Sequence, residues 1–273
     1  MTDTRHILIH AHIFKNAGTT LDWSLQRCFG DAFLDHRDDA QMKTGAAYLG
    51  PFLEANPHLV AVSTHQLRRP MPASAGFRVL PVYLIRHPID RIGSVYEFER
   101  RQRPDTPGAR VATTSSFDDY LRWRMQPTSG ATIRECHTRF CCLNPTVMNL
   151  TDEHLDEAER FLEHEALVSV VDRYDQSMVC FESRLEGAWP RIDLSYVFQN
   201  VSKGVTRPLQ ERIDLVKSRM ADEVLELVTD HNQRDLHLYG FANRLLDQRC
   251  AAITDFDARL QAFRDRCEAL RRL

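Results

Sequence analysis

The sequence lacks the features of several common classes of protein. It has 35 lysines and arginines against 38 aspartates and glutamates, so it carries no basic excess of the kind found in general nucleic-acid-binding proteins. No apolar run is long enough to span a membrane, and residues 1–14 do not have the pattern of a signal peptide. We therefore expect a soluble, cytoplasmic protein that neither crosses a membrane nor binds nucleic acid.

Cysteines are few and irregularly spaced. The seven cysteines include no CxxC pair, and their number is odd. Reduced thiols are therefore expected, which agrees with a cytoplasmic location. His137 lies among Cys136, Cys141 and Cys142, but this spacing fits no standard zinc pattern. We expect no metal site.

The chain is long enough for one large α/β domain. Its 273 residues are 43% hydrophobic, which suffices for a sizeable core. Short, β-prone apolar runs alternate with helical patterns, and this alternation predicts a central parallel sheet flanked by helices. We expect a domain over 1–246 and a C-terminal helical extension over 247–273. The expected strands are 6–13, 59–64, 79–85 and 167–172.

The segment 6–29 is typical of a strand, a short loop and an amphipathic helix. Free N–H groups at the start of a helix, together with the positive end of its dipole, bind anions, and the lysine of this loop adds a mobile charge. The order differs from a Walker A loop, in which lysine follows two glycines, so ATP chemistry is disfavoured. The residues alone also allow an ordinary turn. The loop consists of Lys15, Asn16, Ala17, Gly18, Thr19 and Thr20.

Two further strands bring polar residues to their carboxyl ends. His65 follows the strand 59–64, and Arg86 follows the strand 79–85. Pro88 can start a helix, on which Ser94 lies nearly two turns in. Because carboxyl ends of parallel strands form the ligand edge of a sheet, Arg86 and Ser94 can meet one ligand there. His65 can equally be a hydrogen-bonded histidine at a strand end, and Arg86 and Ser94 can simply cap and solvate the helix.

Both segments are similar to those of one family. HIFKNAGTTL, residues 12–21, resembles the HIPKTGGTT or HIPKTAGTTL motif of sulfotransferases that use 3′-phosphoadenosine 5′-phosphosulfate (PAPS). The resemblance is in particular to the carbohydrate group, which contains heparan sulfate 2-O-sulfotransferase. LIRHPIDRIGSVYEF, residues 84–98, resembles that family's 3′-phosphate-binding element, LRDPVERFVSHYYF. Phe14, Asn16 and His87 replace the family's usual proline, threonine and aspartate. The resemblance runs from about residue 6 to 246.

The resemblance implies a P-loop NTPase-like α/β fold in a soluble, bacterial-type member. It also implies transfer of a sulfuryl group from PAPS to a hydroxyl of a carbohydrate or glycan-bearing acceptor, without a metal. Lys15 would be catalytic and would hold the phosphosulfate together with the rest of the loop 15–20. Arg86 and Ser94 would bind the 3′-phosphate, and His65 would be the general base.

Three other residues are candidates for the site. Lys203 follows a late NVS segment that some sulfotransferases place near the nucleotide, so it is a candidate for the 3′-phosphate. Arg139 lies in CHTRFCCLN, which resembles a family segment near the acceptor. Arg68 lies in a proline-bearing loop, where it can bind the acceptor or simply be solvated.

Apolar residues near the C-terminus recur at heptad spacing. This spacing predicts a coiled-coil seam and a homodimer, although the helix can instead fold back onto the core. The heptad-spaced residues are Leu246, Ile253, Phe256, Leu260, Phe263, Cys267 and Leu270.

Two other functions stay open. One is a kinase or another nucleotide phosphotransferase that uses the same anion-binding loop, against which the loop order and the element with Arg86 and Ser94 both count. The other is a non-enzymatic, nucleotide-responsive assembly protein that works through its C-terminal helix.

Overall fold

The computed structural model describes residues 4–147, 149–199 and 207–272, and these contain a five-stranded sheet. The strand order is β2-β3-β1-β4-β5, and every neighbouring pair is parallel. The chain therefore has the predicted α/β fold, with a P-loop-like central sheet. The strands are β1 (Arg5–Ala11), β2 (Phe33–Asp35), β3 (Ala61–Thr64), β4 (Phe77–Ile85) and β5 (Leu167–Val170).

Four of the five strands lie where the sequence predicts them. The strand that was missed, β2, has three residues, pairs only with β3, and buries only Phe33 fully. A strand of this length shows too few alternations to produce a period-two signal. Short edge strands are consequently the elements that pattern analysis misses first.

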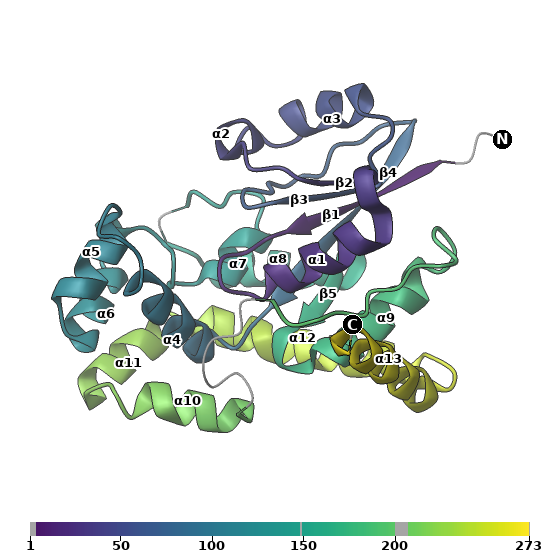
Figure 1. Cartoon of the computed structure of the whole chain (residues 1–273). Helices are drawn as coiled ribbons and strands as arrows, with labels where there is room; N and C mark the ends of the chain where they lie inside the picture. The colour runs from purple at the N-terminus through teal and green to yellow at the C-terminus, as the bar shows by residue number, and fades with distance from the viewer. Residues whose placement is uncertain (1–3, 148, 200–206, 273) are drawn as a thin grey trace.

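Helices cover both faces of the sheet (Figure 1). On one face α3 (Ala46–Ala55), α8 (Asp152–His164) and α12 (Gln233–Ala251) contribute to a core with Ile7 and Ile9 of β1. On the other face α1 (Gly18–Phe29), α9 (Tyr174–Leu185) and α13 (Phe256–Arg271) contribute to a core with Leu8. Since side chains alternate along a strand, β1 supplies both cores.

A third core lies among helices beyond the carboxyl end of β1, toward which the β1 arrow points in Figure 1. Tyr96 and Tyr120 are buried there beside Val216 and Val228. A Cβ atom on Gly93 would come within 2.5 Å of Val216, so glycine allows α4 and α10 to pack closely. The helices are α4 (Pro88–Glu99), α5 (Pro107–Thr114), α6 (Phe117–Met125), α10 (Leu209–Lys217) and α11 (Asp222–Asp230).

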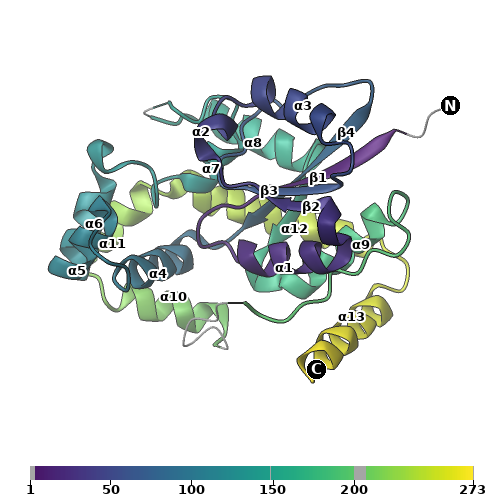
Figure 2. The same ribbon diagram turned by 45° about the horizontal axis from the view of Figure 1, so that its top comes forward.

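The C-terminal helix α13, drawn at the lower right of Figure 2, packs against α9 through its buried residues. Helix α12 ends at Ala251 and α13 begins at Phe256, because Asp255 between them has a left-handed backbone with φ of 56°. Leu260, Phe263 and Cys267 are buried in the core that α13 shares with α9. The heptad positions therefore do not form an exposed seam, and the fold-back alternative describes this helix.

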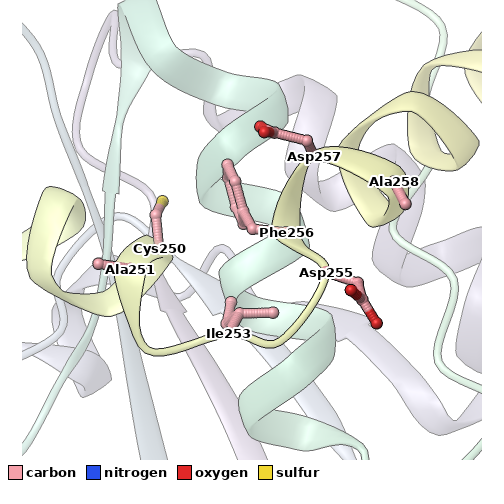
Figure 3. Close-up of a pocket in the computed structure, with 7 residues that line it drawn as sticks. All are labelled: Cys250, Ala251, Ile253, Asp255, Phe256, Asp257 and Ala258. Carbon is pink, nitrogen blue, oxygen red and sulfur yellow. The ribbon is translucent and has the colours of Figure 1, made fainter.

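A pocket of about 500 Å³ opens at the turn between α12 and α13 (Figure 3). It contains none of the residues of the two motifs, so it does not coincide with the candidate site. The pocket is lined by Cys250, Ala251, Ile253, Asp255, Phe256, Asp257 and Ala258.

Among the described residues, no helix combines the length and the apolarity needed to cross a membrane.

Candidate functional site

The candidate site lies at the carboxyl edge of the sheet. β1 pairs with β3 on one side and with β4 on the other. The chain forms β2 and β3 on one side of β1 before it crosses to β4, so the strand order reverses at β1. Ligands of open α/β sheets bind outside the carboxyl ends at such a point. The loop 12–17, His65 and Arg86 follow the three strands that meet there.

The loop after β1 has a strained backbone. Lys15 and Ala17 have φ values of 63° and 60°, in the left-handed region that side chains with a Cβ atom rarely adopt. Ala17 is the N-cap of α1, but it has no side chain that could cap the helix. The N–H group of Thr20 donates to the carbonyl oxygen of Ala17 at 3.1 Å, so the N–H groups of Gly18 and Thr19 are the ones left for partners from outside the helix.

Asn16 holds this loop against β4 and α7 (Cys136–Cys141) through two hydrogen bonds. Its Nδ2 donates to the carbonyl oxygen of Leu84 on β4 at 2.6 Å and to Nε2 of His137 at 2.7 Å. His137 lies on α7, and its Nδ1 is 3.1 Å from a carboxylate oxygen of Asp235 on α12. Burial opposes ionisation of Asp235, but His137 and its hydrogen bonds lower the pKa of that carboxyl group to about 2. His137 thus supports the loop through Asn16.

Arg86 joins the second motif to the first. Its Nη1 donates to the carbonyl oxygen of Lys15 at 2.9 Å, while its Nε donates to Asp90 at 2.8 Å. Asp90 also accepts two hydrogen bonds from Arg212 on α10, at 3.0 and 3.1 Å. Arg91 adds a similar link, because its Nε donates to the carbonyl oxygen of Phe14 at 3.0 Å. The two motifs are therefore joined by hydrogen bonds from Arg86 and Arg91.

The side chain of Lys15 is half-buried beside α4. Its Nζ lies 4.8 Å from the centre of the Phe98 ring, a cation–π contact. Burial and the nearby guanidinium groups of Arg86 and Arg101 lower the pKa of the ammonium group. In the described ranges Lys15 forms no ion pair with a carboxylate. The ammonium group of Lys15 therefore lacks a negative partner in this part of the chain and is available to a bound anion.

The remaining loop residues differ in exposure. Thr19 faces solvent, whereas Thr20 is buried and its hydroxyl accepts from the backbone N–H of Gln199 at 3.4 Å. Gly18 lies beneath the imidazole of His12, and a Cβ atom at this position would come within 2.4 Å of the ring. Ser94 is half-buried on α4.

His65 is the predicted general base, and its side chain is 43% exposed. Its Nδ1 is 4.0 Å from a carboxylate oxygen of Asp39, too far for a hydrogen bond. The ring contacts His12 edge to face, with 5.0 Å between the ring centres. Burial, Arg37 and His12 lower the pKa of His65 and so favour its neutral, proton-accepting form.

An aspartate and two histidines that sequence analysis did not assign form a cluster that contacts His65 through His12. Nδ1 of His10 and Nδ1 of His12 are each 2.7 Å from a different oxygen of Asp22 on α1. Arg37 donates to one of these oxygens at 3.3 Å. The distances of 2.7 Å are those of hydrogen bonds, so each Nδ1 nitrogen faces a carboxylate oxygen of Asp22. The alternation of His10 and His12 along β1 was visible in the sequence, but the pairing with Asp22 was not.

Three predicted residues lie apart from this cluster or outside the described residues. Nη2 of Arg68 donates to the side chain of Gln66 at 3.2 Å. Arg139 donates to the carbonyl oxygens of Pro145 and Val147, so its guanidinium braces the loop after α7. Lys203 lies outside the described residues.

No model of a known protein family matches the chain. The chain is similar to an uncharacterized protein from Archaeoglobus fulgidus, with 27% identity over 246 residues. The matched part is 86% of this chain and 95% of the archaeal protein. The similarity thus covers nearly the whole of both proteins.

Proposed function

We propose that this protein is a PAPS-dependent O-sulfotransferase that acts on a hydroxyl of a carbohydrate or glycan-bearing acceptor. The observation that supports the proposal most is the hydrogen bond of 2.9 Å from Arg86 to the carbonyl oxygen of Lys15. This bond connects the two segments that resemble the phosphosulfate and 3′-phosphate elements of the family. Two anionic ends of one donor can therefore be held by adjoining parts of the chain.

The charges of the site suit such a donor. Lys15 has no carboxylate partner in the described part of the chain, and it lies beside an uncapped helix N-terminus. Both features favour a bound oxyanion. Arg86 and Ser94 would contribute binding energy at the remote 3′-phosphate, which positions the reactive end.

The proposed reaction is an in-line displacement. The acceptor oxygen forms a bond to sulfur while the bond from sulfur to the bridging oxygen breaks, and adenosine 3′,5′-bisphosphate leaves. Lys15 and the free N–H groups at the start of α1 stabilise the negative charge that develops on the bridging oxygen. His65 accepts the hydroxyl proton as general base. This scheme uses no metal.

Calorimetry tests the donor half of this proposal. Full-length protein titrated with adenosine 3′,5′-bisphosphate should bind it more tightly than ATP. Tighter binding of ATP, together with phosphate transfer, would instead identify a phosphotransferase. Binding of either nucleotide without transfer of any group would support a non-enzymatic assembly protein.

The acceptor half requires a transfer assay. Radiolabelled sulfate from PAPS should appear on components of glycan fractions, and we expect less label on small metabolites and on protein.

The proposal includes a cytoplasmic location, because all seven cysteines are free thiols in the structure and thiols stay reduced in the cytosol.

A further inference from the structure

Asp22 holds two imidazoles in defined orientations. Each of its oxygens lies 2.7 Å from a histidine Nδ1, one from His10 and one from His12. Burial opposes ionisation of Asp22, but the charges and hydrogen bonds of the two histidines lower the pKa of its carboxyl group. An ionised carboxylate only accepts hydrogen bonds, so both rings donate to it from Nδ1–H. Nη2 of Arg37 lies 3.3 Å from Nδ1 of His12, but the carboxylate oxygen at 2.7 Å is the closer partner of this nitrogen. In the neutral form of each ring, Nε2 then carries the free lone pair.

The two rings differ in what their free nitrogen can reach. His10 is fully buried, and its Nε2 has no partner among the described residues. His12 keeps 12% of its side chain exposed, rests on Gly18 of the anion-binding loop, and contacts His65. Only His12 therefore connects Asp22 to the candidate site.

We propose that His65, His12 and Asp22 form a proton relay, in which His12 receives at Nε2 the proton that His65 takes from the acceptor hydroxyl. The proposal rests on the sulfotransferase function proposed above. The O–H bond of the acceptor breaks and its proton moves to one nitrogen of His65. His65 then releases the proton of its other nitrogen to His12 through a bridging water, because the described residues show an edge-to-face contact of the two rings but no hydrogen bond between them. His12 becomes an imidazolium that is paired with Asp22, and it later returns the proton to solvent.

The arrangement follows the logic of carboxylate-oriented histidine bases. A carboxylate at Nδ1 fixes the tautomer and stabilises the imidazolium that forms. His65 itself has no such partner, because its distance to Asp39 is 4.0 Å. The charged and titratable groups around His65 are Arg37, His12, Asp39 and Asp35. His12 is the one among these that Asp22 orients.

Nuclear magnetic resonance can identify the tautomer of His12 without an assay of enzyme activity. Long-range correlations between ring protons and ¹⁵N in the full-length protein should show His12 with the proton on Nδ1 at neutral pH. The His12 signals can be assigned by their loss in His12→Asn. In Asp22→Asn the new amide can donate to Nδ1, so His12 should change to the Nε2–H tautomer. An Nε2–H form of His12 in the wild type would overturn the relay.

Turnover with PAPS tests the role of the relay. In His12→Asn the amide nitrogen can still donate to Asp22, but Nε2 is removed. We expect kcat to fall by about 10² to 10⁴ in both His12→Asn and Asp22→Asn, the usual contribution of a general acid or base. The affinity for adenosine 3′,5′-bisphosphate should stay within about twofold of wild type in both variants.

His10→Asn is the matched control. It changes the other ring on Asp22 and also preserves a donor to the carboxylate, so kcat should stay near the wild-type value. If wild type transfers sulfate and both relay variants keep full turnover, the relay is refuted while the proposed function stands. If wild type binds no bisphosphate and transfers no sulfate, the proposed function is refuted together with the relay.

Discussion

Strand β1 and the loop that follows it are adjacent in the chain, but they differ in how far their side chains find partners within the folded protein. In the strand, Ile7 and Ile9 are fully buried in a core shared with several helices. In the loop, Lys15 and Ala17 have left-handed backbones, and Oδ1 of Asn16 is buried without a partner in the described part of the chain. The strand gains its free energy from packing within the folded chain. In the described residues the loop leaves the ammonium group of Lys15 without a carboxylate partner and Oδ1 of Asn16 without a donor, so it gains less from contacts within the folded chain.

This difference separates stability from binding. Changes in the strand should alter the free energy of unfolding and leave nucleotide affinity alone. Changes to the Lys15 side chain should mainly alter binding or rate, whereas Arg86→Ala should alter binding and also lower the free energy of unfolding, because Arg86 donates to the buried carboxylate of Asp90.

The largest effect is expected in the strand. Ile9→Ala should lower the free energy of unfolding by about 2 to 5 kcal/mol, because it removes buried methyl groups and leaves a cavity. Chemical denaturation measures this change, and calorimetry on the folded variant should show unchanged bisphosphate affinity. Ile9→Val should cost only about 0.5 to 1.5 kcal/mol. An unchanged denaturation midpoint in Ile9→Ala would contradict the assignment of this face to the core.

Arg86 should give the next largest effect, on binding. Arg86→Ala should weaken bisphosphate binding by about 2 to 4 kcal/mol, since charge-assisted contacts to phosphate are strong and truncation leaves the phosphate unpaired. Arg212→Ala is the control, because Arg212 holds the same Asp90 carboxylate but does not contact Lys15. Equal affinities of wild type and Arg86→Ala in calorimetry would remove Arg86 from the site.

Lys15 should affect the rate of reaction. Lys15→Ala should lower kcat by about a hundredfold, as loss of a preorganised charge at the bridging oxygen does. The denaturation midpoint should change little, because the Lys15 side chain has no carboxylate partner in the described ranges. Lys15→Arg keeps the charge and should retain more activity. Near-native turnover in Lys15→Ala is the result that would exclude this role.

The smallest expected effect is on how the free energy of unfolding depends on pH, through His10 of β1. Burial lowers the pKa of His10, so the folded state keeps this ring neutral while the unfolded state binds a proton below pH of about 6.5. Stability should therefore be lost as the pH falls below that value, by at most about 1.4 kcal/mol per pH unit for this group. Denaturation at several pH values should show a shallower slope in His10→Asn. An identical slope would mean that His10 does not contribute.

Much of the fold could be predicted because it depends on local patterns. Alternation along β1 and the Pro88 helix start are properties of short segments, and the structure has both. The hydrogen bond between His12 and Asp22 joins the segment after β1 to helix α1, so the spacing of these residues in the sequence does not predict it. For the same reason the support of Asn16 by His137, 121 residues away, could not be predicted. Contacts of this kind depend on how helices and strands pack together, and the sequence of a single segment does not determine that packing.

The packing of Gly18 against His12 bears on how this protein could vary between species. A Cβ atom at position 18 would meet the imidazole at 2.4 Å, whereas the backbone of Gly18 does not have a positive φ. Glycine is therefore required here by its neighbour at position 12 and not by the turn. A relative with a small residue at position 12 could carry alanine or serine at position 18. The two positions should thus change together, and a search pattern that fixes the glycine alone would overlook such relatives.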